Sequence, residues 1–449
     1  VCYQEEVRDP SRMAEVLNRV IEKAIRGSAP AQINIPRDYW TQIVDIELPP
    51  IVRLERQAGG AEAINRAAKL LSVAKFPVIL SGAGVVIGGA IEDCKKLAEK
   101  LDAPVCNGYQ HNDSFPGSHP LAVGPLGYNG SKAAMQLISK ADVVLALGTR
   151  LNPFSTLPGY GLDYWPKDAK IIQVDMNSDR IGLTKKVMVG ICGDVKLVTQ
   201  QLLSKLASNA GDTGREERKN LIHQTKSAWL QTLTSLNHEE DDPGTVWNKE
   251  ARERDKDRMS PRQAWRAIQS GMPEDVIISS DIGNNCAIGN AYPTFEKGRK
   301  YLAPGLFGPC GYGFPSILGA KIGCPDTPVI GFAGDGAFGI SMSEMSSCAR
   351  KEWPKISMVI FRNYQWGAEK RNSILWFDNN FVGTELDPEL SYAKVANACG
   401  LKGITVKTME ETTKAIKQSC EDQKKGITTF IEVILNQELG EPFRRDAMK

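Results

Sequence analysis

Two short motifs in the last third of the chain combine residue types that could hold a metal ion and a phosphate group. Gly334-Asp335-Gly336 follows an apolar run typical of a buried strand, and Asn363 follows the next such run, 28 residues after Asp335. Glycines on both sides of Asp335 let the backbone approach a phosphate closely, and a helix that starts there offers free N–H groups to it. Asp335 and Asn363, with a nearby backbone carbonyl, supply the few hard oxygen ligands with which magnesium is usually held. The pattern therefore predicts a magnesium ion that bridges a diphosphate.

A third group of polar residues, Asp-Ile-Gly-Asn-Asn at 281–285, follows another predicted strand. Ligands of open parallel sheets bind outside the carboxyl ends of the strands, so the three groups should share one edge of a sheet. Taken alone, Gly-Asp-Gly could be only a turn. Its pairing with Asn363 across one strand–helix–strand unit favours the ligand site over the turn.

The elements that position these residues form a predicted α/β domain at 260–436. It opens with Ser260-Pro261-Arg262-Gln263, which combines a capping serine, a proline at the first helical position and a glutamine three residues after the serine. Short apolar runs that alternate with helical patterns predict a doubly wound parallel sheet with helices on both faces. The predicted strands are 276–280, 329–332, 356–361 and 428–435, and the predicted helices are 342–352 and 410–421.

A second domain with the same alternation is predicted at 60–206. Gly82-Ala83-Gly84 followed by Gly88-Gly89 does not complete the glycine pattern of a dinucleotide site, so we expect this domain to be structural. Its predicted strands are 77–80, 104–106, 143–147 and 171–175, and its predicted helices are 61–74, 91–101 and 195–206.

The remaining segments are predicted to be a partial domain, a linker and a tail. Residues 1–50 hold a helical pattern and one strand at 32–36, too little to bury their apolar faces alone. We interpret them as the last part of a domain that begins upstream of Val1, with a trimmed N-terminus as the alternative. Residues 207–259 mix both charge signs and predict a solvated linker, with a helix at 219–233, rather than a binding patch. Residues 437–449 form a C-terminal tail.

The composition of the 449 residues narrows the class of protein. A content of 42% hydrophobic and 24% charged residues is that of an ordinary globular protein. The 55 basic and 53 acidic residues leave a net charge of +2, with no basic surplus for nucleic acid or an acidic membrane surface. No run approaches the roughly 18 apolar residues of a membrane span, and without an apolar run behind a basic start we expect no signal peptide. Ten cysteines without a C-x-x-C pair and four histidines without zinc-ligand spacing indicate reduced thiols, no structural zinc and a cytoplasmic protein.

The Gly-Asp-Gly…Asn pattern resembles the diphosphate and magnesium motif of the thiamine-diphosphate-dependent enzymes, and the resemblance extends over the whole chain. It implies that residues 1–50 end the pyrimidine-binding domain, 60–206 form the central domain and 260–436 form the diphosphate-binding domain. The implied magnesium ligands are Asp335, Asn363 and the backbone carbonyl of Gln365. The other residues that the resemblance places around thiamine diphosphate are Gly283, Asn284, Asn285, Gly308, Cys310, Gly334, Gly336, Ala337 and Phe338.

Two residues depart from the usual pattern of this family. Arg362 stands where the first asparagine of an Asn-Asn pair is usual, and it adds a positive charge near an anionic site. Cys310 is smaller than the aliphatic residue that usually keeps the cofactor bent, so it is either a prop for the cofactor or a plain packing residue. The glutamate that activates the cofactor in this family lies in the pyrimidine-binding domain, so we expect it upstream of Val1. The chain as written is therefore expected to be weak or inactive.

Three segments, 308–315, 362–372 and 439–446, resemble family members that transfer an acetyl group from sulfoacetaldehyde to phosphate. This resemblance implies acetyl phosphate and sulfite as products, in the breakdown of taurine and other sulfonates. No external oxidant is required, because sulfite leaves with the electron pair of the carbon–sulfur bond. The site must then accept two tetrahedral anions, which arginine binds through its planar fork. We nominate as anion contacts Arg362, Lys370 and Arg371, with a solvated helix start as the alternative for the last two.

Two other functions remain open from the sequence. A carboligase similar to acetolactate synthase, acting on 2-oxoacids, would share the same cofactor motif. A non-catalytic subunit that keeps the fold would explain the missing glutamate but not the intact metal motif. The resemblance also implies a homodimer or homotetramer, with the cofactor bound between two subunits.

Overall fold

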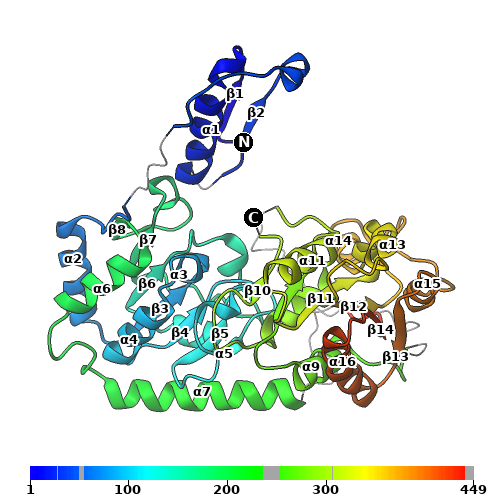
Figure 1. Cartoon of the computed structure of the whole chain (residues 1–449). Coiled ribbons are helices and arrows are strands. Elements are labelled where there is room, and N and C mark those ends of the chain that lie inside the picture. Colours follow the sequence, from blue (N-terminus) through cyan, green and yellow to red (C-terminus); the bar gives the residue numbers. More distant parts are fainter. Residues whose placement is uncertain (28, 50–54, 236–252, 254, 306, 440–449) are drawn as a thin grey trace.

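The computed structural model describes the chain except for residues 28, 50–54, 236–252, 254, 306 and 440–449. Two six-stranded parallel sheets with helices on their faces lie side by side, and a smaller N-terminal unit stands apart from them (Figure 1). This arrangement confirms the predicted α/β class with doubly wound parallel sheets. Part of the predicted linker, residues 236–252 and 254, and most of the predicted C-terminal tail lie outside the described residues.

The first sheet forms the central unit, and its strands follow the order β5-β4-β3-β6-β7-β8 with every pair parallel. The strands are β3 (Pro77–Ser81), β4 (Val105–Asn107), β5 (Ala122–Pro125), β6 (Val143–Leu147), β7 (Lys170–Asp175) and β8 (Val189–Cys192). The helices are α2 (Ala61–Ser72), α3 (Ala83–Ile87), α4 (Ile91–Leu101), α5 (Lys132–Ile138) and α6 (Val195–Lys205).

The two strands in the middle of this sheet, β3 and β6, form where the sequence is a run of apolar residues. Every residue of β3 and of β6 is buried, because helices cover both faces of the sheet. The predicted strands and helices of the unit are confirmed to within one or two residues at each end. The sequence pattern does not predict the edge strands β5 and β8, since each has four residues and contains a glycine, Gly124 or Gly190.

The second sheet forms the C-terminal unit, with the order β10-β9-β11-β12-β14-β13 and parallel pairing throughout. The strands are β9 (Ile277–Ser280), β10 (Tyr301–Leu302), β11 (Val329–Gly334), β12 (Ser357–Arg362), β13 (Lys402–Val406) and β14 (Thr429–Ile434). The helices are α9 (Pro261–Gly271), α10 (Asn284–Ile288), α11 (Gly313–Gly323), α12 (Asp335–Ile340), α13 (Met345–Cys348), α14 (Gly367–Trp376), α15 (Tyr392–Ala398) and α16 (Met409–Lys424).

Local sequence signals in this unit succeed at one helix and fail at another. The capping box of α9 is confirmed, because Ser260 Oγ accepts from the N–H of Gln263 at 3.1 Å and Gln263 Oε1 accepts from the N–H of Ser260 at 2.8 Å. The helix predicted at 342–352 is wrong in extent, since a short 3-10 turn precedes α13 and α13 ends at Cys348. Four serines between residues 341 and 347 weaken this helix, because serine side chains compete with the helical backbone for hydrogen bonds.

A long helix, α7 (Arg215–Ser235), runs along one side of both units (Figure 1). Its Arg218 is buried, and Trp229 packs in the core of the C-terminal unit. The segment predicted as a solvated linker therefore contains a longer helix than expected, packed against both units. The guanidinium of Arg218 donates five hydrogen bonds, to the backbone carbonyls of Lys75, Leu101, Asp102, Gly211 and Thr213.

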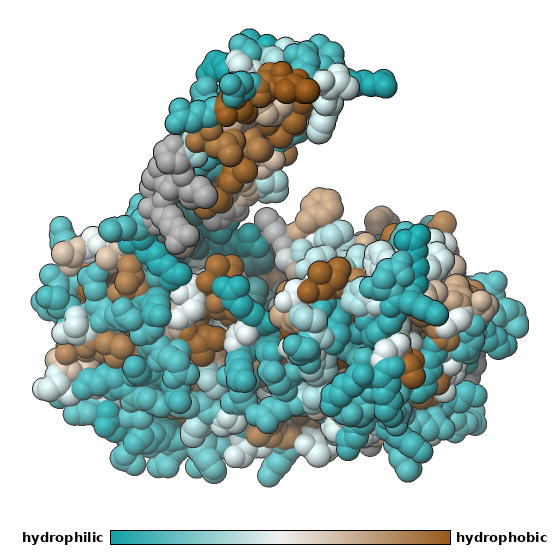
Figure 2. Space-filling model, viewed as in Figure 1, coloured by the Kyte–Doolittle hydropathy of each residue, from teal (hydrophilic) through white to brown (hydrophobic). Residues whose placement is uncertain are grey.

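The N-terminal unit consists of β1 (Tyr3–Glu6), α1 (Met13–Gly27) and β2 (Ala31–Asn34), with the two strands paired in parallel. The sequence pattern misses β1, which contains two glutamates. A small apolar cluster joins α1 to the strands, but Ile25 remains 71% exposed. Figure 2 shows hydrophobic residues gathered on one face of this unit. As expected for so few elements, the unit leaves part of its apolar surface exposed.

Two further expectations concern the chain as a whole. In the part of the chain that the structure describes, no helix is long and apolar enough to cross a membrane. All ten cysteines are free.

Candidate active site

The predicted site lies at the carboxyl edge of the second sheet, where the strand order reverses. β9 pairs with β10 on one side and with β11 on the other, so the chain leaves β9 toward one edge and returns on its opposite side. Ligands of open parallel sheets bind in the crevice at such a point. Asp281 follows β9, Gly334 ends β11 just before Asp335, and Asn363 follows the adjacent β12. The structure thus brings the three predicted groups to one edge of the sheet.

Asp335 is buried at the first position of α12, and its carboxylate is held from several sides. Oδ2 accepts hydrogen bonds from the N–H of Tyr364 at 2.7 Å and from Nη1 of Arg362 at 3.1 Å. Oδ1 accepts from the N–H of Gly336 at 3.0 Å. Burial raises the pKa of Asp335 to about 6, although Arg362 and the N–H donors lower it in part. These contacts fix an anionic oxygen donor beside the segment that carries Asn363.

Asn363 and Gln365 lie on the turn that follows β12, and both are buried. Tyr364 between them has a left-handed φ of 62°, which reverses the direction of the backbone. The side chain of Gln365 donates from Nε2 to the carbonyl of Gln437 at 3.1 Å. This bond holds the Gln365 side chain at Gln437. The predicted metal ligand is therefore the backbone carbonyl of Gln365 and not its side chain. The turn offers an amide oxygen and a carbonyl oxygen, both of the hard type that magnesium prefers.

Asn284 and Asn285 open α10 after Gly283, whose φ of 122° favours glycine. Both asparagines are buried. Among the described residues, neither amide atom of Asn284 nor Oδ1 of Asn285 has a hydrogen-bond partner. Such buried polar atoms are rare, because each unmet group costs about 1–3 kcal/mol. These residues therefore fit a polar ligand such as a cofactor diphosphate.

Asp281 has a structural role that sequence reasoning missed. Its Oδ1 accepts from the N–H of Gly311 at 3.1 Å, and its Oδ2 accepts from the N–H of Gly313 at 2.7 Å. The carboxylate therefore clamps the loop that carries Gly308 and Cys310 to the end of β9. Gly308 has a left-handed φ of 64°, and Cys310 is exposed on this loop. The sequence signal for this contact was an aspartate directly after a predicted strand, Asp281, with a glycine two residues later, Gly283.

Gly336, Ala337 and Phe338 form the first turn of α12 after Asp335. A methyl group on Gly336 would lie 2.7 Å from the ring of Trp366, so only glycine fits without movement of the ring. The ring of Phe338 packs in the core, with its centroid 5.4 Å from that of Phe314. These residues therefore present backbone rather than side chains to the crevice, as the predicted role in diphosphate binding requires.

The structure separates the basic residues nominated as anion contacts. Arg362 is 1% exposed, and its guanidinium bonds Asp335 and the backbone carbonyls of Asp387 and Leu390. It is therefore not available to a substrate anion, which corrects our nomination: it neutralises Asp335 instead. Tyr364 covers the same guanidinium, with 4.3 Å between Cζ and the ring centroid.

Lys370 and Arg371 begin α14 in different surroundings. Lys370 forms an ion pair with Glu385 and lies 3.5 Å from Oε1 of Gln437. Arg371 is buried and reaches the central unit, where its Cζ lies 5.0 Å from the ring centroid of Tyr128. Burial lowers the pKa of Arg371 to about 10, which leaves it charged at neutral pH. Of the three nominated residues, Arg371 is the one for which the structure describes a contact with the central unit.

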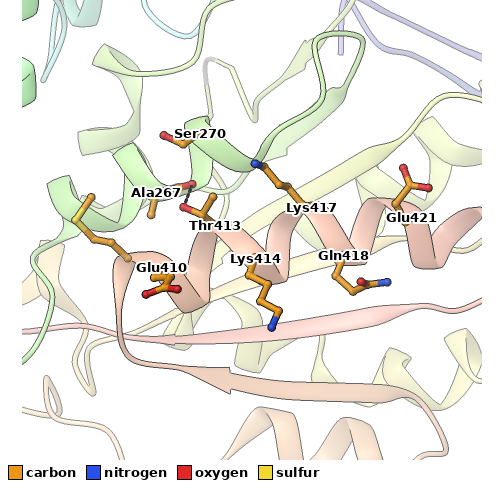
Figure 3. A pocket seen from close by; sticks show the side chains of 9 residues that line it. Ala267, Ser270, Glu410, Thr413, Lys414, Lys417, Gln418 and Glu421 are labelled. Carbon is orange, nitrogen blue, oxygen red and sulfur yellow. Dashed lines mark hydrogen bonds between the residues drawn. The ribbon is translucent and has the colours of Figure 1, made fainter.

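Two other hollows lie away from these residues. One, of about 420 Å³, is at the carboxyl edge of the central sheet and is lined by Gly84, Gly148, Arg150, Asp175 and Arg180 among others. Another, of about 650 Å³, lies between α9 and α16 (Figure 3), where Thr413 Oγ1 donates to the carbonyl of Ala267 at 2.9 Å. The lining of the second hollow includes none of the predicted site residues.

Comparison with protein families defines the class of protein to which this fold and site belong. The family model of the thiamine pyrophosphate enzyme central domain matches residues 64–202, and that of the C-terminal thiamine-pyrophosphate-binding domain matches residues 281–433. The fold and the site are those of a thiamine-diphosphate-dependent enzyme. A solved structure of a thiamine-diphosphate-dependent 4-hydroxybenzoylformate decarboxylase from Rhodococcus jostii shares the fold, with a TM-score of 0.73 and 23% identity over 97% of this chain and 76% of that one.

Curated relatives narrow this class further. A probable sulfoacetaldehyde acetyltransferase of Rhizobium meliloti is 77% identical over the whole chain and 76% of its own length. A sulfoacetaldehyde acetyltransferase of Roseovarius nubinhibens is 72% identical over 74% of its length. The chain belongs to the sulfoacetaldehyde acetyltransferase family. A probable acetolactate synthase large subunit of Methanococcus aeolicus is more distant, at 27% identity over 93% of this chain and 70% of its own length.

Proposed function

We propose that this protein transfers the acetyl group of sulfoacetaldehyde to inorganic phosphate, giving acetyl phosphate and sulfite, with thiamine diphosphate and magnesium bound. The proposal is carried by the convergence of Asp335, Asn363 and the unpartnered Asn284 at one strand edge, in a chain 77% identical to a probable sulfoacetaldehyde acetyltransferase. The net reaction needs no oxidant, because the carbon–sulfur bond breaks with its electron pair on sulfite. The free thiols support a cytoplasmic location.

The residues of the crevice fit the diphosphate and magnesium. The side chains of Asp335 and Asn363 and the backbone carbonyl of Gln365 would hold the metal. Nδ2 of Asn284, which has no partner among the described residues, would donate to the diphosphate, with Asn285 beside it. Bound thiamine diphosphate supplies a carbon nucleophile and an electron sink.

The protein contributes order and charge around this cofactor. Arg362 and the N–H of Tyr364 keep the Asp335 carboxylate in place. Asp281 holds the loop of Gly308 in register with the end of β9, since it bonds two N–H groups of that loop. Preorganised donors cost no rearrangement when the reaction takes place.

The decisive experiment uses the protein expressed from its complete coding region, supplied with thiamine diphosphate, magnesium, sulfoacetaldehyde and phosphate. Sulfite and acetyl phosphate are measured together. Equal amounts of both, lost when phosphate is omitted, are the expected result. Formation of 2-hydroxy-2-methyl-3-oxobutanoate from pyruvate without phosphate would instead support the carboligase reading. If neither sulfite nor acetyl phosphate forms, the acetyltransferase proposal is refuted.

The family resemblance further supports a homodimer or homotetramer with the cofactor at a subunit boundary. Sedimentation with and without thiamine diphosphate and magnesium measures this directly. A monomer at micromolar concentration with the cofactor bound would contradict the shared site.

A further inference from the structure

Arg371 lies on α14 one helical turn after Gly367. Gly367 adjoins Asn284, which with Asn285 and the first turn of α12 forms the predicted binding site for the diphosphate, called the cradle below. A methyl group on Gly367 would be 3.1 Å from Nδ2 of Asn284. One turn of helix advances about 5.4 Å, so Arg371 stands one turn away from the cradle. At that point it contacts Tyr128 of the central unit. Arg371 is 5% exposed, so a ligand that reaches it must enter the boundary between the two units.

The central unit meets Arg371 with a tightly built loop, residues 127–130, between β5 and α5. A methyl group on Gly127 would lie 1.8 Å from the carbonyl oxygen of Phe154, and one on Gly130 would lie 2.4 Å from that of Pro125. No side chain fits at either glycine without movement of the backbone. The loop is therefore fixed in one shape, and it carries Tyr128 in that shape.

Two backbone carbonyls of this loop accept hydrogen bonds from side chains around it. Nδ2 of Asn290, in the turn just after α10, donates to the carbonyl of Tyr128 at 3.3 Å. The hydroxyl of Tyr160 donates to the carbonyl of Gly130 at 3.0 Å. The first bond joins the loop to the C-terminal unit at the far end of the helix that begins with Asn284. The loop is thus bonded to the turn that directly follows α10, the helix that begins with Asn284.

Asn129 of this loop has a buried side chain and an unusual backbone conformation, and the contacts described so far explain neither. It is 2% exposed and has a left-handed φ of 50°. Among the described residues, neither its Nδ2 nor its Oδ1 has a hydrogen-bond partner. A buried amide with both ends unmet is costly, as is the backbone conformation that places it there. A polar ligand at the boundary would meet the amide and account for both costs.

We propose that Arg371 and Asn129 together bind the sulfonate group of the aldehyde substrate, an inference that rests on the proposed function. The guanidinium fork matches two oxygens of a tetrahedral anion, and the ring of Tyr128 fixes the plane of that fork. The amide Nδ2 of Asn129 donates to the third oxygen. The anion is thus held by one group from each unit, and an aldehyde without a sulfonate finds no counterpart there. Inorganic phosphate is the other tetrahedral anion of the reaction, and the test separates the two.

The test compares three variants with the wild type, all loaded with thiamine diphosphate and magnesium. Arg371→Gln removes the cation, and Asn129→Gly removes the amide while it tolerates the positive φ. Arg66→Gln is the matched control, since this exposed arginine of the central unit contacts only the carbonyl of Met188 among the hydrogen bonds described. Near-ultraviolet circular dichroism verifies the fold of each variant. If Arg371→Gln does not fold, Arg371→Lys replaces it, since it keeps the charge and loses the fork.

Steady-state kinetics give the first readout. We expect Arg371→Gln to raise the KM for sulfoacetaldehyde about 100-fold and Asn129→Gly about 10-fold, in line with loss of a charged and of a neutral hydrogen-bonding group. The KM for phosphate should stay within twofold of the wild type, as should every parameter of Arg66→Gln. A rise in the KM for phosphate alone would overturn the assignment of Arg371 and Asn129 to the sulfonate. It would show instead that these residues bind phosphate. Unchanged KM values for both substrates would overturn it as well.

Calorimetric titration with ethanesulfonate, an unreactive sulfonate, gives a readout that needs no turnover. The wild type should bind ethanesulfonate, and both site variants should lose that binding while they retain thiamine diphosphate. If the wild type makes no acetyl phosphate yet binds ethanesulfonate through Arg371, the proposed function fails and the anion pocket stands. If it makes acetyl phosphate and the variants bind ethanesulfonate as the wild type does, only the pocket fails.

Discussion

Replacement of Glu438 by glutamine tests the energetics of a buried carboxylate beside the site. Glu438 has no exposed surface, and among the described residues neither of its carboxylate oxygens has a hydrogen-bond partner. Among the described residues, Glu438 forms an ion pair with Arg262 of α9, with 3.8 Å between Nε and Oε1. Burial therefore raises the pKa of Glu438 from its ordinary value of 4.5 to about 7, although Arg262 lowers it in part. We expect Glu438→Gln to stabilise the protein above neutral pH.

The size and sign of the effect follow from this pKa. Between pH 4.5 and about 7 the folded chain keeps a proton on Glu438 that the unfolded chain releases, so the free energy of unfolding falls as pH rises through that window. One pKa unit corresponds to about 1.4 kcal/mol, so ionisation of Glu438 costs about 3 kcal/mol by pH 8. Glutamine cannot ionise and escapes this loss. The variant should match the wild type below pH 4.5 and exceed it by up to about 3 kcal/mol at pH 8.

Urea unfolding at several pH values measures this difference. Intrinsic tryptophan fluorescence follows the unfolding transition, and Trp265, which is buried on the same helix as Arg262, contributes to it. Glu352→Gln is the control, since Glu352 is exposed on the same unit. A tight buried ion pair would give the opposite sign, because loss of one partner then costs about 3–5 kcal/mol. A variant less stable than the wild type at pH 8 would thus refute the reasoning and show that the pair with Arg262 dominates.

Three further changes have defined outcomes. Asp335→Ala should abolish magnesium-dependent binding of thiamine diphosphate in calorimetry while the circular dichroism of the fold persists; retained binding would remove Asp335 from the metal site. Arg218→Met should lower the free energy of unfolding by about 3 kcal/mol or more, because five carbonyls lose their donor; a change below 1 kcal/mol would contradict the anchoring role of α7. Gly336→Ala should destabilise by about 1–3 kcal/mol through contact with Trp366, whereas Gly334→Ala, with no atom within 4 Å of its added methyl group, should not; equal melting temperatures would refute the contact.

The sequence by itself determined the elements that depend on near neighbours, and it predicted the candidate ligand residues. Apolar runs covered on both faces predict β3, β6, β11 and β12, because parallel strands in such sheets have no polar face. The cap of α9 lies within four consecutive residues, 260–263, so it is readable without the fold. Asp335 and Asn363 follow adjacent strands, and parallel strands end at the same edge, so their meeting could be predicted as well.

Tertiary structure alone decided the partners of those residues across long separations. Arg362 neutralises Asp335 rather than facing a substrate, and no local pattern encodes where its guanidinium turns. Arg371 meets Tyr128 of another unit, and the unmet amide of Asn129 becomes visible only when every neighbour is known. The physical reason is that hydrogen-bond satisfaction and desolvation depend on all groups around an atom, whereas periodicity and capping depend on the few residues beside it in the chain.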